Sequence, residues 1–562
     1  MNKKIIGPIL LSVLVLASCN LTNTKKRKPY NPTTGDTSLT TEDSTSSGTS
    51  GGSSSSGGTT SSGSSSTSGS SSSSSGTSST STDPATPVVT SVTLSSHAES
   101  VKQGASVTLT ATVVGKNNPS KTVTWTTSNS SVATVLNGVV SVKSGATVGA
   151  TVKITATSTV TPSVSDYCTI TVLSAAASES YTILIYMCGA DLESSHTTDE
   201  YQGFASSDLR EILATPNKPS NVNIVVETGG AKKWASNPGT DASFLQRRHV
   251  EGSSLVVDQN ATKDNMGLSS TLQSFLTWGL KTYPADHTGL IMWNHGGAVS
   301  GCCFDENYSK DGLLASEMDS AFKNAFSAAG VSGKLDWIGY DCCIMSYADL
   351  ASINSQYFKY MVSSQELEAG AGWDYDAWLP TLYNNTSVST ETLLTKICDT
   401  FVSENGGSSS NNDQCLSVLN LQNFSSFQTQ FESFASGLKS SDWSKISSAY
   451  SSSLRFANLS DDYYSTIYGY GLADAKDFLS KASSRGYDTT AASNALDAVL
   501  ANSSYGGFYT GTKPCGLDIF VPADNSYYAQ VSEDEYGASD TKLSNWRNFV
   551  IANGTFYTGG WY

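Results

Sequence analysis

Two apolar segments of this sequence each run into a residue that can take part in covalent chemistry. Residues 290–294 lead into His295, and residues 335–340 lead into Asp341 and, two positions later, Cys343. A thiol becomes a strong nucleophile when a base lies within hydrogen-bonding reach, and imidazole is the side-chain base suited to neutral pH. We therefore predict that Cys343 attacks an electrophilic carbon while His295 takes up and returns the proton.

Gly296 and Gly297 follow His295 directly. Glycine lets the backbone pass close to a bound substrate, and backbone N–H groups aimed at a developing oxyanion stabilise a tetrahedral transition state. We expect these two residues to provide that backbone site. Asp341 has two interpretations at this level: its carboxylate caps a helix that begins near Ser346, or it forms part of the site beside Cys343.

The reactive residues must be positioned by the elements around them. Apolar runs alternate with stretches whose apolar residues recur at helical spacing, as in residues 272–280 and 314–326. Such alternation predicts an α/β sheet with helices on both faces, and sites in sheets of this kind lie beyond the carboxyl ends of the strands. The expected strands are residues 181–187, 222–227, 289–293, 335–340 and 359–363.

Five short segments resemble, in the same order, the sequence blocks of the clostripain family of cysteine peptidases, which belongs to the caspase-like clan. The separation of His295 and Cys343 is also similar to the spacing of about 50 residues in caspases. This resemblance covers about residues 180–560 and implies a caspase-like α/β sheet flanked by helices, acting on peptide bonds of protein or peptide substrates. The segments are Tyr186-Met187, Asn294-His295-Gly296-Gly297, residues 340–346, residues 368–373 and residues 516–522.

The resemblance also assigns roles to individual residues. The family's catalytic Cys follows an Asp by two positions, which implies that Cys343, and not the adjacent Cys342, is the nucleophile. The matching Asp341 then contributes to a pocket for a basic P1 side chain, so cleavage after Arg or Lys is expected. Ala371 stands where some basic-specific relatives have an acid. Glu368, Asp374 or Asp376 could supply the missing acid in its place. If none of them does, the pocket prefers a P1 side chain other than Arg or Lys.

A metal site is the main alternative chemistry. Its candidate ligands are His295 and two cysteine pairs, Cys302-Cys303 and Cys342-Cys343. Adjacent cysteines chelate zinc poorly compared with cysteines separated by two to four residues, so we expect no metal in this site and no required cofactor. Calcium remains a possible but unsupported ligand, because the sequence has no compact Asp-x-Asp-x-Asp-Gly loop.

The N-terminus indicates export. Lys3 and Lys4 precede an apolar run that is too short to span a bilayer, a pattern typical of a signal peptide. The run ends in Leu-Ala-Ser-Cys, which resembles a bacterial lipobox, so we interpret residues 1–18 as a lipoprotein signal peptide and Cys19 as the lipidated residue. An ordinary signal peptide cut near Ala17 is the alternative. Residues 19–84, rich in Ser, Gly and Thr, are expected to form a disordered tether to the membrane of the cell envelope.

Residues 85–174 carry closely spaced, alternating β-branched runs, which predict an antiparallel sandwich. The segments 124–129 and 131–135 resemble bacterial immunoglobulin-like domains, which act as spacers or adhesion modules. A surface adhesin with a vestigial peptidase domain over residues 178–562 is therefore the alternative function. The net charge of −16 argues against nucleic acid as a partner.

Overall fold

The structure is a computed structural model that describes residues 86–173, 179–197, 203–457, 459–461, 466–523, 536 and 542–556. The proposed signal peptide, Cys19 and the tether lie outside these residues. The described chain divides into two compact units, one before and one after the segment around residue 175. No helix in the described part of the chain has the length and apolar character needed to cross a bilayer.

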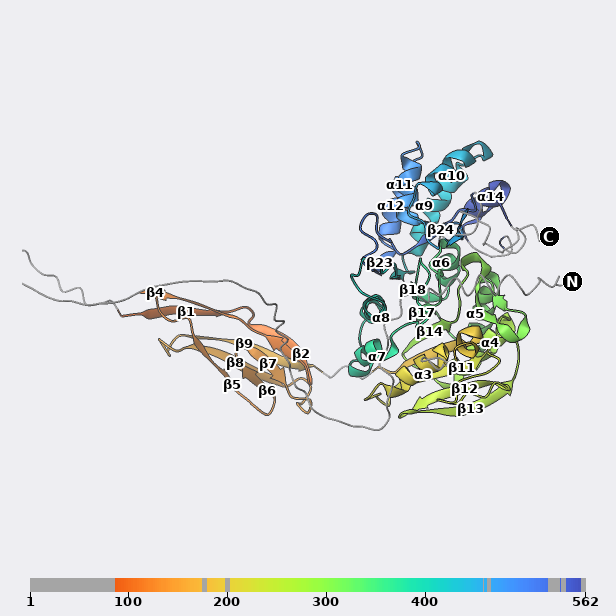
Figure 1. Ribbon diagram of the computed structural model, residues 1–562. Coiled ribbons are helices and arrows are strands. Elements are labelled where there is room, and N and C mark those ends of the chain that lie inside the picture. Colours follow the sequence, from red (N-terminus) through yellow and green to blue (C-terminus); the bar gives the residue numbers. More distant parts are fainter. Residues whose placement is uncertain are drawn as a thin grey trace, which may run out of the picture. The chain divides into compact units, whose positions relative to one another are not determined.

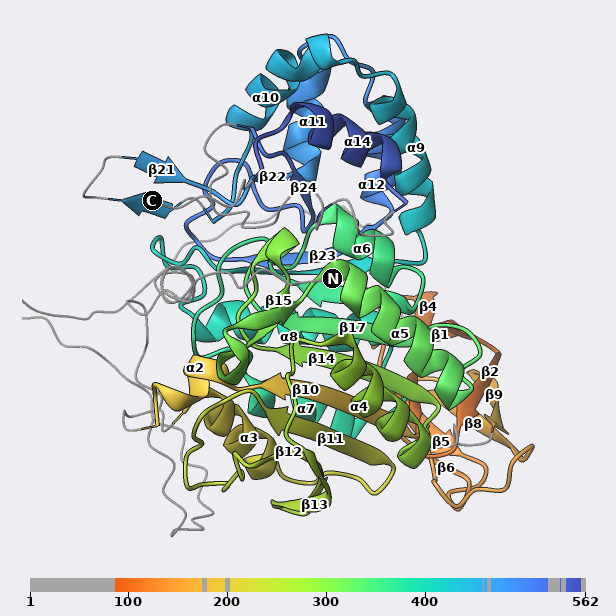
Figure 2. The same ribbon diagram turned by 90° about the vertical axis from the view of Figure 1, so that its right-hand side faces the viewer.

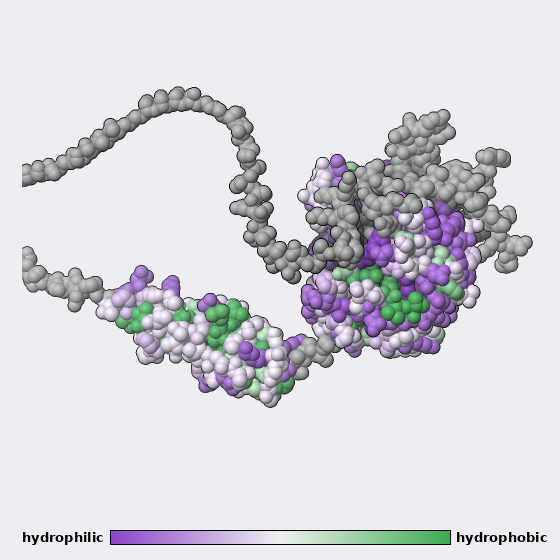
Figure 3. All heavy atoms as spheres, turned by 60° about the horizontal axis from the view of Figure 1, so that its bottom comes forward, coloured by the Kyte–Doolittle hydropathy of each residue, from purple (hydrophilic) through white to green (hydrophobic). Residues whose placement is uncertain are grey.

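The N-terminal unit is an all-β domain, as the sequence predicts (Figure 1). Its strands form a four-stranded sheet (β2-β9-β8-β5), a three-stranded sheet (β3-β7-β6) and the pair β1-β4. Alternate residues of β8 are buried in an aliphatic core that includes Val152, Ile154 and Ile170. Apolar residues also reach the surface of this unit (Figure 3). Leu136, for example, is 74% exposed. The strands are β1 (Val88–Leu94), β2 (Ala98–Lys102), β3 (Ser106–Thr108), β4 (Ala111–Lys116), β5 (Val123–Thr127), β6 (Ala133–Leu136), β7 (Val139–Val142), β8 (Thr151–Ser158) and β9 (Ser165–Leu173).

The C-terminal unit is built on a nine-stranded sheet in the order β13-β12-β11-β10-β14-β17-β18-β19-β23. The five strands from β11 to β18 are parallel, and both edges are completed by antiparallel pairs. The five strands predicted from the sequence are these five parallel strands. The bounds are β10 (Tyr181–Cys188), β11 (Val222–Gly229), β12 (Phe244–Glu251), β13 (Ser254–Thr262), β14 (His287–Trp293), β17 (Leu335–Asp341), β18 (Phe358–Ser363), β19 (Cys415–Asn420) and β23 (Leu500–Tyr505).

Helices cover both faces of this sheet, so the predicted α/β architecture is confirmed. Figures 1 and 2 show α4 and α5 on one face and α7 and α8 on the other, with α3 beside α7. Because the central strands are covered on both sides, every residue of β10 and β17 is buried. The bounds are α3 (Phe204–Ala214), α4 (Ser269–Thr282), α5 (Ala315–Ala329), α6 (Ala348–Asn354), α7 (Tyr375–Asn384) and α8 (Thr390–Glu404).

A group of helices beyond the β23 edge completes the unit (Figure 2). Trp546 packs there against the rings of Phe431 and Phe478. The helices are α9 (Phe424–Ser436), α10 (Trp443–Ser451), α11 (Ala475–Ser483), α12 (Thr490–Asp497) and α14 (Ser544–Asn553), and two short strand pairs, β20 (Leu459–Asp461) with β21 (Thr466–Tyr468) and β22 (Leu472–Asp474) with β24 (Asp518–Phe520), accompany them.

The register of β14 and β17 aligns the two segments that carry the reactive residues. The strands are parallel neighbours, and Trp293 at the end of β14 lies opposite Asp341 at the end of β17. His295 and Cys343 each follow two residues later, at the same edge of the sheet.

Candidate active site

The loops after β14 and β17 are in direct contact. A methyl group added to Gly296 would overlap the backbone carbonyl of Cys343, so only glycine allows the two chains to approach this closely. His295 is 1% exposed and Cys343 is 2% exposed. The structure therefore brings the segments of both predicted residues together in a buried place at the carboxyl edge of the sheet.

The turn that carries Cys343 is held by the segment after β18. The Cys343 Sγ accepts a hydrogen bond from the backbone N–H of Glu368 at 3.3 Å. The Ile344 N–H donates to the Glu366 carbonyl at 3.1 Å. Ile344 has a φ of +52°, a left-handed conformation that is costly for a β-branched residue. The surrounding hydrogen bonds fix this strained turn and with it the direction of the thiol.

The C-terminal block of the family resemblance supports the same turn from its other side. The Ser346 Oγ donates to the Gly516 carbonyl at 2.6 Å, and the Asp518 N–H donates to the Ser346 carbonyl at 2.8 Å. Gln365 links this block to the segment after β18, because its Nε2 donates to Asp518 Oδ1 at 2.8 Å. A segment some 170 residues downstream of the thiol in the sequence thus supports the loop that carries it.

His295 is held through its neighbour Asn294. The Asn294 Nδ2 donates to the Cys188 carbonyl at the end of β10, at 2.6 Å, and the Asn294 Oδ1 accepts from the Phe304 N–H at 2.7 Å. The His295 carbonyl accepts from the Cys303 N–H at 3.3 Å. The strand after the histidine loop, β15 (Cys302–Asp305), pairs with β16 (Asp311–Leu313). Together these contacts fix the backbone on both sides of the imidazole.

Asp191 lies beside the imidazole and is the site residue that the sequence reasoning missed. Its Oδ1 is 3.3 Å from His295 Nε2, and its Oδ2 is 3.3 Å from the Lys310 ammonium. Burial raises the pKa of Asp191, but His295 and Lys310 lower it by more, so the net pKa lies well below the usual range. Its signal in the sequence was a carboxylate just beyond a predicted strand, the same feature that singled out Asp341.

The two glycines differ in how their backbone is used. The Gly297 N–H donates to the Gly301 carbonyl at 2.8 Å, which closes the turn that contains the 3₁₀ segment Ala298–Ser300. Gly296 instead lies against the Cys343 backbone. An oxyanion role for these glycines stays a prediction, and the geometry favours Gly296 for it.

The Asp341 carboxylate lies against the start of α7 and the residues just before it. Its Oδ2 accepts from the Tyr375 hydroxyl at 3.0 Å and from the Trp373 N–H at 3.4 Å. The helix after the thiol, α6, begins at Ala348 with Tyr347 as its N-cap. Asp341 is therefore not the cap of that helix, which removes the simplest structural explanation for its presence.

Glu368 is a second buried carboxyl group next to Asp341 and Cys343. It is 3% exposed, and its carboxyl group interacts with the Asp341 carboxyl group and with the Trp373 side chain. Burial raises the pKa of Glu368 well above its usual value, and the neighbouring Asp341 and Cys343 raise it further. Glu368 therefore loses its proton less readily than an ordinary carboxyl group, and a cation placed beside it would favour the ionised form.

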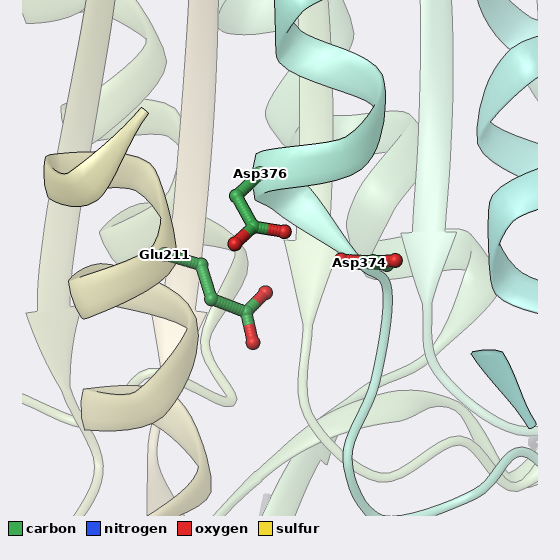
Figure 4. A group of neighbouring side chains, drawn as sticks. All are labelled: Glu211, Asp374 and Asp376. Carbon is green, nitrogen blue, oxygen red and sulfur yellow. The ribbon is translucent and has the colours of Figure 1, made fainter. Parts of the chain in front are cut away.

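The two other acids proposed as substitutes point elsewhere. Asp374 and Asp376 gather with Glu211 of α3, with their carboxylate oxygens within 4.8 Å of one another (Figure 4). Glu211 also accepts a hydrogen bond from the Tyr375 N–H at 3.1 Å. Among the described residues, this trio is the only group of three potential metal ligands that lie this close together. The ligands of the alternative metal site, His295 with the cysteine pairs, form no such group.

Cys342 points away from the thiol of Cys343. Its Sγ donates to the Met292 carbonyl at 3.3 Å, and its thiol also interacts with those of Cys302 and Cys303. Burial raises the pKa of Cys342 well above that of an ordinary thiol. A thiol that is protonated and enclosed is a poor nucleophile, so Cys342 is a small buried side chain in this fold.

A parallel sheet that carries His and Cys on adjoining strand ends, with helices on both faces, is the architecture of caspase-like cysteine peptidases. The model of the clostripain family matches residues 185–552, more than half of the chain, and the model of bacterial Ig-like domains (group 2) matches residues 88–167. The chain belongs to the clostripain family, and it is a cysteine protease. The comparison with curated proteins found no match.

Several solved structures are similar to this chain. One is an inactive zymogen C11 protease from Parabacteroides distasonis, with 18% identity and a TM-score of 0.46, covering 64% of this chain and 98% of that one. Another is a secreted C11 cysteine protease from Bacteroides thetaiotaomicron in complex with an irreversible peptide inhibitor, with 16% identity and a TM-score of 0.45, covering 64% of this chain and 99% of that one.

The contact between Gly296 and Cys343 gives the first prediction. Gly296→Ala should reduce proteolysis at least about tenfold, because the added methyl group forces the loop away from the thiol, and a displacement of about 1 Å at a site can cost as much as 100-fold. Initial rates on a peptide substrate and a thermal unfolding curve measure the effect. Gly511→Ala, where an added methyl group meets no atom within 4 Å, is the matched control. Full activity of Gly296→Ala would contradict the proposed close approach.

Proposed function

We propose that this protein hydrolyses peptide bonds with Cys343 as the nucleophile and His295 as its base. His295 accepts the thiol proton as Cys343 attacks the peptide carbonyl carbon, and the tetrahedral intermediate collapses to a thioester with release of the amine, which takes the proton from the imidazole. Water, deprotonated by His295, then hydrolyses the thioester and restores the thiol. No other group is required to balance the protons.

The single observation that carries this proposal is the aligned pair of strand ends. β14 and β17 are in parallel register, and the residue after His295 packs against the backbone of Cys343. The other candidate thiol, Cys342, is directed at the Met292 carbonyl. Both predicted residues are present and buried at one edge of the sheet, which argues against a vestigial domain that serves only adhesion.

The second prediction concerns the two residues themselves. Cys343→Ala and His295→Ala should each reduce kcat/KM to the background of the assay, because nucleophile and base act as one unit. Cys342→Ala should retain most of the activity and serves as the matched control. Hydrolysis of a peptide library with the three variants side by side measures this. An active Cys343→Ala with an inactive Cys342→Ala would place the nucleophile one residue earlier.

We further propose that the enzyme cleaves after Arg or Lys, with Asp341 and Glu368 as the acids of the P1 pocket. Both carboxyl groups are buried next to Cys343 and interact with each other. A guanidinium or ammonium group in this space forms charge-assisted hydrogen bonds, which are about twice as strong as neutral ones. In this chain Glu368 takes the part that an acid at position 371 plays in basic-specific relatives.

The third prediction separates these acids from the exposed ones. Asp341→Asn and Glu368→Gln should each lower kcat/KM on substrates with Arg at P1 by about 10- to 100-fold, since each removes one charge that pairs with the substrate. Asp376→Asn should have little effect, because Asp376 faces Glu211. A cleavage profile over a P1 library gives the comparison. A wild-type profile with no preference for Arg or Lys would refute the specificity proposal and leave the protease assignment intact.

We also propose that the mature protein is anchored in the bacterial cell envelope through a lipid on Cys19. The lipobox-like sequence before Cys19 and the long polar segment after it support this. The fourth prediction is that wild-type protein partitions into the detergent phase of a Triton X-114 extraction, while Cys19→Ala partitions into the aqueous phase or remains unprocessed. Wild-type protein found in the aqueous phase would contradict the anchor.

A further inference from the structure

Asp191 is placed against the imidazole by an unusually well-anchored short segment. It belongs to α2 (Ala190–Ser194), which follows β10 directly. The neighbouring carboxylate, Glu193, is buried and accepts hydrogen bonds from the Ser206 N–H at 2.9 Å, the Ser206 hydroxyl at 2.7 Å and the Ala235 N–H at 2.8 Å. These three bonds fix the segment to α3 and to the loop after β11, so Asp191 has little freedom to move away from His295.

The start of α2 is also constrained. Ala190 has a φ of +45°, and a side chain on Gly189 would press on the ring of Trp234. The Cys188 carbonyl, one residue before Gly189, accepts the hydrogen bond from Asn294. Asn294, the residue before His295, is thus hydrogen-bonded to Cys188, three residues before Asp191. The ends of the adjacent strands β10 and β14 therefore set the distance between the imidazole and the carboxylate.

We propose that Asp191 is a positioning residue for His295, so that the working unit is Cys343–His295–Asp191 and not a Cys–His pair alone. The carboxylate lies 3.3 Å from Nε2, which leaves Nδ1 to exchange the proton with the thiol. A carboxylate beside the ring nitrogen that does not exchange the proton, here Nε2, holds the imidazole in one orientation. It also stabilises the imidazolium that forms when the thiol loses its proton. This inference rests on the proposed function.

Lys310 shares the same carboxylate. Its ammonium lies 3.3 Å from Asp191 Oδ2, on the oxygen that does not face the ring. Lys310 keeps Asp191 ionised and holds it in place, and it limits how much of the negative charge acts on His295. Cys188 at the end of β10 interacts electrostatically with Asp191 and also with Cys302, Asp305 and Glu306. Cys303 on β15 lies beside His295, whose carbonyl accepts from its N–H.

The test is a pH profile of kcat/KM for full-length protein with Asp191→Asn. The variant should lose at least about tenfold in kcat, with KM nearly unchanged, because removing the carboxylate that orients a catalytic histidine can cost up to about 10⁴-fold. The shape of the pH profile should also differ from that of wild-type protein, because the carboxylate beside the imidazole is gone. Asp191→Glu, which restores a carboxylate, should recover part of the lost rate.

Glu306→Gln is the matched control, because Glu306 lies near the same segment but pairs with Lys232. It should leave the pH profile unchanged. Thermal unfolding of each variant, and labelling with an irreversible peptidyl inhibitor, show whether the fold and the thiol are intact. If Asp191→Asn keeps the wild-type kcat and pH profile while Cys343→Ala is inactive, the Asp191 proposal is wrong and the proposed function stands. If Cys343→Ala remains active, the proposed function itself is wrong.

Discussion

The whole site depends on the parallel pairing of β14 with β17. Trp293 and Asp341 lie opposite each other in the parallel pair. His295 and Cys343, each two residues further along the chain, therefore leave the sheet at the same edge. The next contact, between Gly296 and the backbone of Cys343, works only if this register is kept. A slip of one residue would turn every side chain of a strand to the opposite face of the sheet. The helices on both faces, which bury β17 and all of β14 beyond its first residue, hold the register.

Around this pair the protein keeps a set of buried carboxyl groups in different charge states. Asp191 is ionised because His295 and Lys310 stand beside it, which lowers its pKa in spite of burial. Glu368 is in the opposite situation, because burial and nearby negative charge raise its pKa. The same type of side chain thus stands in two different electrostatic environments, and we propose that one carboxyl group positions the imidazole while the other receives a cationic substrate group. Environment, and not residue type, assigns these two roles.

Sequence reasoning found the centre of the fold more readily than its edges. The five parallel strands are buried on both faces and appear as continuous apolar runs, which made them recognisable. The edge strand β13 is mostly exposed and β12 carries Arg247 and Arg248, so neither shows a simple apolar pattern. The candidate pair His295 and Cys343 could be singled out because both residues follow predicted strand ends and have the residue types of a base and a nucleophile. Asp191 was missed, and Glu368 was not singled out from Asp374 and Asp376, because their placement depends on how loops fold back over the sheet.

We propose that Cys343, two residues beyond the end of β17, is the cysteine that reacts. The most direct measurement is mass spectrometry of the protein after treatment with a peptidyl acyloxymethyl ketone, followed by mapping of the modified peptide. We expect one adduct per chain, on Cys343, formed rapidly in wild-type protein and at a strongly reduced rate in His295→Ala. An adduct on Cys342 or on another cysteine, or labelling that is equally fast without His295, would contradict it.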